Sequence, residues 1–261
     1  MRTLAKLLLG GALLVLSFAA REMSAQEIRV AAAADLRPAL EEIVGRFQAQ
    51  SGAKVSVSYG SSGNFFQQIQ SGAPFDLFFS ANLDYPKKLE ASALTVPGSY
   101  YEYARGKIVL LVQSGSTLDI KQGSKILLDP SVKKISIADP NHAPYGQAAV
   151  AALQTENIYD KVSPKLVNGE NISQAASFVL SGAADVGIAS LSLALSPATR
   201  AKVRFWEIPQ NDYPPIQQAS VVLRSSKNQK LAMQFESYFQ TREVKEILER
   251  YGFEIPAANK K

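Results

Sequence analysis

Short apolar runs alternate with apolar residues at helical spacing along this chain, and that alternation constrains the fold more than any other feature. Residues 28–33 predict a strand, after which Leu36, Leu40, Ile43 and Phe47 recur at the spacing of one helix face. Strands and helices that alternate in this way are typical of α/β proteins, in which helices cover the faces of a sheet. The sequence therefore predicts an α/β fold.

The same pattern continues to the end of the chain. A helix that carries Phe65 and Ile69 stops at Gly72 and Pro74, and two closing helices end near Gly252. The other segments predict helices at 147–154 and 172–180, and strands at 54–59, 76–81, 107–113, 134–138, 185–189, 203–208 and 218–223.

Two arrangements account for this order of elements. In the first, residues 26–105 plus 216–261 form one lobe and residues 106–215 form a second, so that two chain crossings make a hinge. In the second, all strands join a single larger sheet. Periodicity alone does not decide between them.

The N-terminus has the features of a secretory signal. Arg2 and Lys6 precede an apolar run at 7–20, and Ser24 and Ala25 supply the small residues of a cleavage site. The run is shorter than the roughly 20 residues that a membrane-spanning helix needs. The chain has no cysteine, which excludes both disulfides and a lipidated anchor. We expect residues 1–25 to be removed and the mature protein to be soluble in the periplasm.

Several functional classes find no support in the sequence. The net charge of +5 is scattered rather than gathered in a basic run, so no nucleic-acid partner is expected. His142 is the sole histidine, and the S-x-x-K spacing at 131–134 lacks its companion motifs, so no catalytic residue is predicted. Asp35, Asp76, Asp139 and His142 show no metal-ligand spacing.

Four predicted junctions between a strand or turn and a helix consist mainly of small or hydroxyl residues and contain no lysine or arginine. In open α/β sheets, ligands bind beyond the carboxyl ends of strands, where helix N-termini present free NH groups that hold anions without a cationic side chain. Taken singly, each junction is better explained by a tight turn or a helix cap than by anion binding. The junctions lie at 33–35, 60–63, 143–146 and 170–173.

The order of these motifs resembles the molybdate-binding proteins of ABC transporters, over essentially the whole mature chain. The similarity lies in residues 31–36 (AAAADL), 60–63 (GSSG), 71–81 (SGAPFDLFFSA), 101–107 (YEYARGK), 139–140 with 143–146 (DP and APYG), 181–187 (SGAADVG) and 251–253 (YGF). The resemblance implies a type II periplasmic-binding-protein fold, in which each of two lobes has a mixed sheet flanked by helices and the ligand lies in the cleft between them.

The resemblance also implies the site and its ligand. Asp35, Ser62 and Ile172 would offer main-chain NH groups, Ser62 also its hydroxyl, and Tyr145 a phenol. The full expected set of oxyanion-binding residues is Ala34, Asp35, Ser61, Ser62, Tyr145, Asn171 and Ile172. The ligand would be molybdate or tungstate, with no cofactor and with molybdenum present only inside the ion. The implied partner is a membrane permease with its ATPase at the inner membrane, and we expect a monomer.

Two positions depart from the family pattern. Some members have a serine or threonine hydroxyl where this chain has Ala34 and Asp35, and some carry a ligand tyrosine where it has Ser190, a phenol that Tyr145 would replace. For Asp35 we favour an N-cap role, in which the carboxylate accepts from NH groups one turn on. The alternative is that Asp35 accepts a proton from the ligand, which would favour a protonated oxyanion such as hydrogen phosphate.

The residues alone leave two other functions possible. One is a binding protein for another small oxyanion such as phosphate or sulfate. The other is a secreted hydrolase or adhesin, since Tyr100, Tyr101 and Tyr103 form an aromatic cluster suited to carbohydrate stacking. Because the cluster precedes a predicted strand, we expect it to pack beside the hinge instead.

Overall fold

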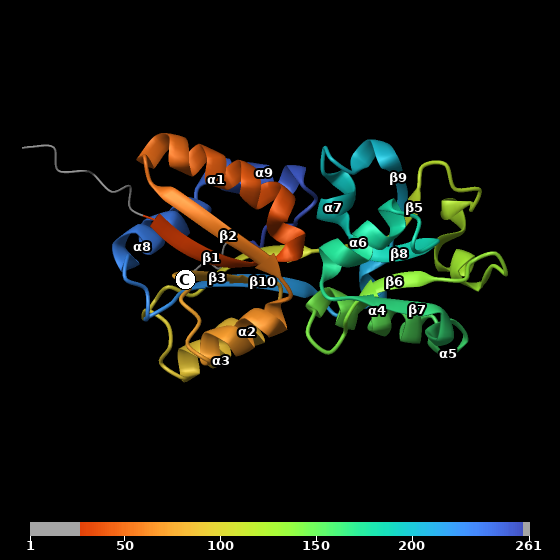
Figure 1. The fold of residues 1–261 in the computed structure, drawn as a ribbon, viewed down its shortest axis with the longest axis horizontal. Helices are drawn as coiled ribbons and strands as arrows, with labels where there is room; N and C mark the ends of the chain where they lie inside the picture. Colours follow the sequence, from red (N-terminus) through yellow and green to blue (C-terminus); the bar gives the residue numbers. More distant parts are fainter. Residues whose placement is uncertain (1–26, 258–261) are drawn as a thin grey trace, which may run out of the picture.

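The computed structural model describes residues 27–257 and consists of two α/β lobes side by side (Figure 1). The predicted signal peptide and its cleavage site lie outside the described residues and stay a prediction. Within residues 27–257, no helix has the length and apolar character needed to cross a membrane.

The first lobe is built on a five-stranded sheet with the order β2-β1-β3-β10-β4. β1 is parallel to β2 and β3, whereas β10 is antiparallel to β3 and β4. Helices α1, α8 and α9 pack on one face of the sheet and α2 and α3 on the other. The elements are β1 (Glu27–Ala33), η1 (Ala34–Leu36), α1 (Arg37–Ser51), β2 (Lys54–Gly60), α2 (Ser62–Gln70), β3 (Leu77–Ser80), α3 (Asp84–Ala91), β4 (Tyr101–Gly106), β10 (Ile216–Val222), α8 (Gln229–Phe239) and α9 (Arg242–Arg250).

The second lobe has a sheet of the same kind with the order β7-β6-β8-β5-β9. β6 is parallel to β7 and β8, and β5 is antiparallel to β8 and β9. The elements are β5 (Ile108–Gln113), η2 (Ile120–Leu128), β6 (Ile135–Ala138), α4 (Pro144–Thr155), α5 (Tyr159–Val162), η3 (Ser163–Lys165), β7 (Leu166–Gly169), α6 (Ile172–Leu180), β8 (Val186–Ser190), α7 (Leu191–Leu195), η4 (Arg200–Lys202), β9 (Val203–Glu207) and η5 (Gln210–Asp212).

The sequence explains why the central strands are buried. β3 (LFFS), β6 (ISIA) and β8 (VGIAS) are buried along their whole length and read as continuous apolar runs, as expected for strands covered on both faces. In the first lobe, Phe79 packs edge-on against Tyr103 and Phe235. These apolar runs fix the sheets and place the carboxyl ends of the parallel strands at the boundary between the lobes.

The chain passes from the first sheet to the second between β4 and β5 and returns between β9 and β10. The two-lobed α/β fold is therefore confirmed, and the alternative of a single larger sheet is wrong. Near the first crossing, the main-chain NH of Ile108 donates to Tyr213 Oη at 3.2 Å. Tyr213 precedes β10, so this hydrogen bond ties the two crossings together.

The sequence did not predict two of the strands. Residues 101–106 form β4 itself rather than a segment in front of a strand, because Tyr101 and Tyr103 alternate with polar residues along an edge of the sheet. Tyr103 is buried, whereas Tyr100 donates to Glu102 Oε1 at 2.9 Å, so the three tyrosines form no common stacking surface. The second missed strand is β7, whose short segment is only partly buried and leads directly into α6.

A candidate anion-binding site between the lobes

A small cavity of about 10 Å³ lies where the two lobes meet. Pockets for organic ligands are typically several hundred Å³, so this space is far too small for a sugar or an amino acid. Its walls contain no lysine or arginine. The first lobe contributes Ala33, Ala34, Asp35, Gly60, Ser61, Ser62 and Ala81, and the second contributes Ala143, Pro144, Tyr145 and Ile172.

The start of α2 supplies two serines to this cavity. Ser61 is the N-cap, and its hydroxyl accepts from the NH of Asn64 at 3.4 Å. The Ser62 hydroxyl accepts from the NH of Ala81 at 2.9 Å, which leaves its own proton for another acceptor. Ser61 therefore acts on the helix, whereas Ser62 can donate into the cavity.

Two helix N-termini of the second lobe face the same space. α4 begins with Pro144 at its first position, where a missing NH costs nothing, and Tyr145 follows. α6 begins at Ile172 after the N-cap Asn171, whose side chain accepts from Ser173 and Gln174. Asn171 thus holds the helix start in place, and it does not line the cavity.

The main-chain NH groups that no cap satisfies lie around the cavity. Among residues 27–257, the main-chain NH groups of Ser62, Tyr145 and Ile172 have no hydrogen-bond partner. An α-helix leaves its first NH groups unpaired and carries about half a positive charge at that end. Three converging helix starts therefore create a positive potential and a set of free donors without any cationic side chain.

Asp35 is fully buried at the wall of this cavity. Its Oδ2 accepts from Tyr145 Oη at 2.8 Å and from Gln218 Nε2 at 2.7 Å, and Tyr103 Oη donates to Gln218 Oε1 at 2.7 Å. We call these four residues, Asp35, Tyr145, Gln218 and Tyr103, the buried network. The other carboxylate oxygen, Oδ1, is buried and has no hydrogen-bond partner among the described residues.

Burial raises the pKa of Asp35 from its usual 3.8 to about 6, although the hydrogen bonds from Gln218 and Tyr145 lower it. The main-chain NH groups of Asp35 and Leu36 lower this pKa further, but neither is in hydrogen-bond geometry. Burial also raises the pKa of Tyr145 and Tyr103 well above the usual range, so both phenols keep their protons. The carboxyl thus titrates near neutrality among groups that stay uncharged.

The N-cap role that we favoured for Asp35 is wrong. The helix start after η1 has no side-chain cap hydrogen bond, and Asp35 lies inside η1 rather than before a helix. The physical reason is the partners across the cleft, since Tyr145 and Gln218 offer donors to the carboxylate whereas Pro38, in the first turn of α1, has no NH to offer.

Several hydrogen bonds hold the lobes together around the cavity. Ser173 Oγ donates to the carbonyl of Ala34 at 3.1 Å, and Ser192 Oγ donates to the carbonyl of Asp35 at 2.7 Å. On the other side, the NH of Gly63 donates to the carbonyl of His142 at 2.9 Å. A Cβ on Gly63 would lie 2.6 Å from that carbonyl oxygen, so only glycine permits this approach.

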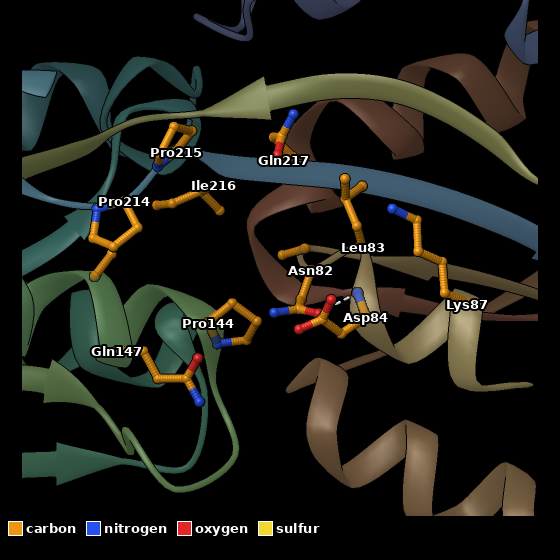
Figure 2. A pocket seen from close by; sticks show the side chains of 12 residues that line it. Asn82, Leu83, Asp84, Lys87, Pro144, Gln147, Pro214, Pro215, Ile216 and Gln217 are labelled. Atoms are coloured by element: carbon orange, nitrogen blue, oxygen red, sulfur yellow. Dashed lines mark hydrogen bonds between the residues drawn. The ribbon is translucent and has the colours of Figure 1, made fainter.

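A wider hollow of about 350 Å³ flanks the contact between the lobes (Figure 2). Its walls come from the start of α3, the start of α4 and the return crossing, with Lys87 on one side and Pro214 and Pro215 on the other. The NH of Asp84 at the start of α3 is already paired with Asn82 Oδ1 at 2.6 Å. The start of α3 therefore offers this hollow no free NH at Asp84, in contrast to the helix starts at the small cavity.

Of the seven residues that the sequence suggested, the structure brings Ala34, Asp35, Ser61, Ser62, Tyr145 and Ile172 around one cavity, and only Asn171 stands outside its wall. Ser190, the position of a tyrosine in some relatives, is the N-cap of α7 and does not line the cavity. Sequence reasoning missed Gln218. A glutamine in a mostly buried strand needs a polar partner, and that requirement was the available signal.

A two-lobed α/β chain with a small cavity between its lobes, lined by free main-chain NH groups, is typical of solute-binding proteins. A family model for bacterial extracellular solute-binding proteins matches residues 28–254, and the chain belongs to that family. A solute-binding protein of this family is not an enzyme.

Several individual relatives of the chain are named as molybdate-binding proteins. The chain is 36% identical over 230 residues to the molybdate-binding protein ModA of Rhodobacter capsulatus, which covers 88% of this chain and 89% of the relative. It is also 36% identical to ModA of Azotobacter vinelandii, over 88% and 90%. Among solved structures, the periplasmic molybdate-binding protein of Azotobacter vinelandii superposes with a TM-score of 0.82 at 33% identity, over 88% of this chain and all of that one.

Proposed function

We propose that this chain is a periplasmic binding protein that captures molybdate, or its close analogue tungstate, and delivers it to an ABC permease with its ATPase at the inner membrane. The observation that carries the proposal is the convergence of three unpaired main-chain NH groups and the Ser62 hydroxyl on one small cavity. The relatives named as molybdate-binding proteins support the choice of ion.

The energetics favour an anion with several oxygen acceptors. Hydrogen bonds to a charged group are worth about 1.5–3 kcal/mol each, so a handful of them offsets much of the cost of removing a dianion from water. A tetrahedral oxyanion presents its acceptors in several directions, which matches donors that arrive from the starts of α2, α4 and α6. A neutral ligand would leave these donors poorly satisfied.

A second candidate is a protonated oxyanion such as hydrogen phosphate. The buried Oδ1 of Asp35 favours it, because an unpaired carboxylate oxygen on the wall of an anion site either repels the ligand or shares a proton with it.

An oxyanion panel tests the choice of ligand. We expect molybdate and tungstate to stabilise purified residues 26–261 in a thermal-shift assay, by about 2.7 kcal/mol at 100 times the dissociation constant. Sulfate and phosphate should give smaller shifts at equal concentration. A larger response to phosphate would select the second candidate, and no response to any oxyanion would reject the proposal.

A pair of hydroxyl deletions tests the site. Ser62→Ala should weaken molybdate binding by about 10- to 100-fold, because it removes one donor to a charged ligand. Thr241→Ala is the matched control, since Thr241 caps α9 far from the cavity and its loss should cost about 1 kcal/mol of stability without changing affinity. Equal affinities of the two variants for molybdate in calorimetry would show that the binding site lies elsewhere.

We also propose that residues 1–25 act as a signal peptide and that the mature protein is a monomer. Mass spectrometry of the periplasmic fraction should find a mature N-terminus at Gln26, and light scattering should give the mass of one chain. The match to a family of extracellular solute-binding proteins supports export of the mature chain.

A further inference from the structure

The unpaired oxygen of Asp35 has no structural role that the fold explains. Oδ2 accepts two hydrogen bonds from Tyr145 and Gln218, whereas Oδ1 is buried and has no hydrogen-bond partner among residues 27–257. A buried polar atom without a partner costs stability. Since Asp35 is one of the residues lining the cavity, the ligand is the partner that the geometry leaves for Oδ1.

An ionised Asp35 would oppose the function of the site, because its negative charge would stand beside the bound anion. A protonated Asp35 would support it, since a carboxylic acid has one O–H donor. Both hydrogen bonds from Tyr145 and Gln218 go to Oδ2, so the proton belongs on Oδ1, the oxygen that the network leaves free.

We propose, on the basis of the anion-binding function above, that the site binds its ion with Asp35 protonated. Oδ1 then donates a hydrogen bond to an oxygen of the ion, and capture takes up one proton from the solvent. Asp35 thereby favours ions with a free acceptor oxygen at this position over ions that bring their own proton.

Among residues 27–257, no cationic side chain contacts Asp35 to stabilise its ionised form in place of a proton. The titratable groups that face it are Tyr145 from α4 and Tyr103 from β4, and both are uncharged phenols. α6 and α7 contribute the hydroxyls of Ser173 and Ser192, which donate to main-chain carbonyls of η1.

The other residues near Asp35 are neutral or interact with groups other than its Oδ1. In α1, Arg37 stacks on the Tyr59 ring at 4.1 Å and pairs with Glu41 at 3.7 Å. His142 precedes α4 and meets α2 through its main-chain carbonyl. Gln218 from β10 donates to Oδ2 and is neutral.

The raised pKa of Asp35, about 6, agrees with this role. In the free protein the carboxyl is then largely ionised at pH 8 and largely protonated at pH 5. A bound dianion raises the pKa further, because a neighbouring negative charge favours the neutral acid. Proton uptake on binding should therefore approach one per ion at about pH 8 and fall toward zero at about pH 5.

Calorimetry in buffers of different ionisation enthalpy measures this uptake directly. For the wild-type chain with molybdate, we expect about one proton taken up at about pH 8, and a dissociation constant that rises about tenfold per pH unit above the pKa of Asp35. In Asp35→Asn, the amide replaces the protonated carboxyl, so Nδ2 donates to the ion and Oδ1 accepts from Tyr145 and Gln218. Uptake should then be zero and affinity independent of pH.

Asp76→Asn is the matched control. Asp76 is a buried carboxylate of the same lobe, but both of its oxygens are paired, with the NH of Arg29 at 2.7 Å and Ser226 Oγ at 2.6 Å. Its replacement should leave proton uptake unchanged.

The possible outcomes separate the two proposals. Tight molybdate binding without proton uptake in the wild type, or undiminished uptake in Asp35→Asn, overturns the role of Asp35 and leaves the proposed function intact. Tight phosphate binding without uptake overturns both, because the ligand then supplies the proton. Binding of no oxyanion at any pH also overturns both.

Discussion

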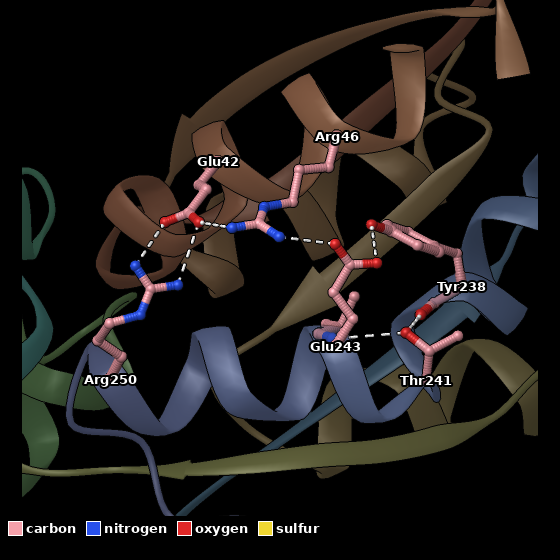
Figure 3. A network of polar contacts seen from close by, with 7 residues as sticks. Glu42, Arg46, Tyr238, Thr241, Glu243 and Arg250 are labelled. Carbon is pink, nitrogen blue, oxygen red and sulfur yellow. Dashed lines mark hydrogen bonds and ion pairs between the residues drawn. The ribbon is translucent and has the colours of Figure 1, made fainter. Parts of the chain in front are cut away.

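Two networks are centred on carboxylates of the first lobe, and they differ in the partners that surround the carboxylate. In the buried network, Asp35 is held only by neutral donors, and burial raises its pKa. In the surface network, Glu42 and Glu243 bridge α1 and α9 through Arg46 and Arg250 (Figure 3). Hydrogen bonds from Arg250 and Arg46 lower the pKa of Glu42.

The difference shows which property each network serves. Paired charges at the surface connect two helices. Each pair contributes little to the free energy of unfolding, and salt screens it. A lone carboxyl among uncharged groups costs stability when it ionises, and folding tolerates that cost only where something else is gained. The buried network therefore belongs to the binding site, and the surface network belongs to the fold.

Gln218→Leu should have the largest effect on stability. It removes a donor to Asp35 and leaves the Tyr103 hydroxyl without its acceptor, so we expect a loss of about 4 kcal/mol in the free energy of unfolding at neutral pH. Urea denaturation measures it. Gln217→Leu, one residue earlier in β10, is the control and should cost far less because Gln217 is only partly buried. Equal losses would show that the buried network is not a unit.

Asp35→Asn should stabilise the protein at neutral pH. Because the folded pKa lies above the usual 3.8, the folded state binds the proton more tightly, so the contribution of Asp35 to stability is fully present below about pH 4 and is lost as pH rises to about 6. Asparagine has no charge to bury, so the variant should be more stable by about 3 kcal/mol at pH 7, with a difference that shrinks toward zero at pH 4. Denaturation across this range tests it, and a pH-independent difference would contradict the raised pKa.

Glu42→Gln should have the smallest effect, with the opposite pH dependence. The lowered pKa of Glu42 means that its ion pairs stabilise the fold above its usual pKa of 4.5, and this contribution is lost as pH falls through the lower folded value. We expect a loss within about 1 kcal/mol at pH 7 that shrinks in high salt. A loss as large as that of Gln218→Leu, measured in the same urea titration, would remove the distinction between the two networks.

Much of the fold was predictable from local patterns, and the site was predictable in part. Apolar runs such as 28–33 and 135–138 lie in strands because buried strands need them, and the glycine- and serine-rich junction at 60–63 marks the start of a helix. β4 was missed because an edge strand with exposed Arg105 lacks the apolar signature. The partners of Asp35 were also missed, since Tyr145 and Gln218 are 110 and 183 residues away along the chain.

Gly106 lets the buried network lie close to the first crossing between the lobes. A Cβ at Gly106, the last residue of β4, would collide with Tyr145 Oη and lie 2.8 Å from Gln218 Nε2, so the network rests directly on the first crossing between the lobes. Rotation of one lobe on the other is absorbed at such crossings. Any side chain larger than hydrogen at position 106 would displace the Tyr145 phenol, so the close contact of the two lobes at Asp35 depends on a glycine in the connecting chain.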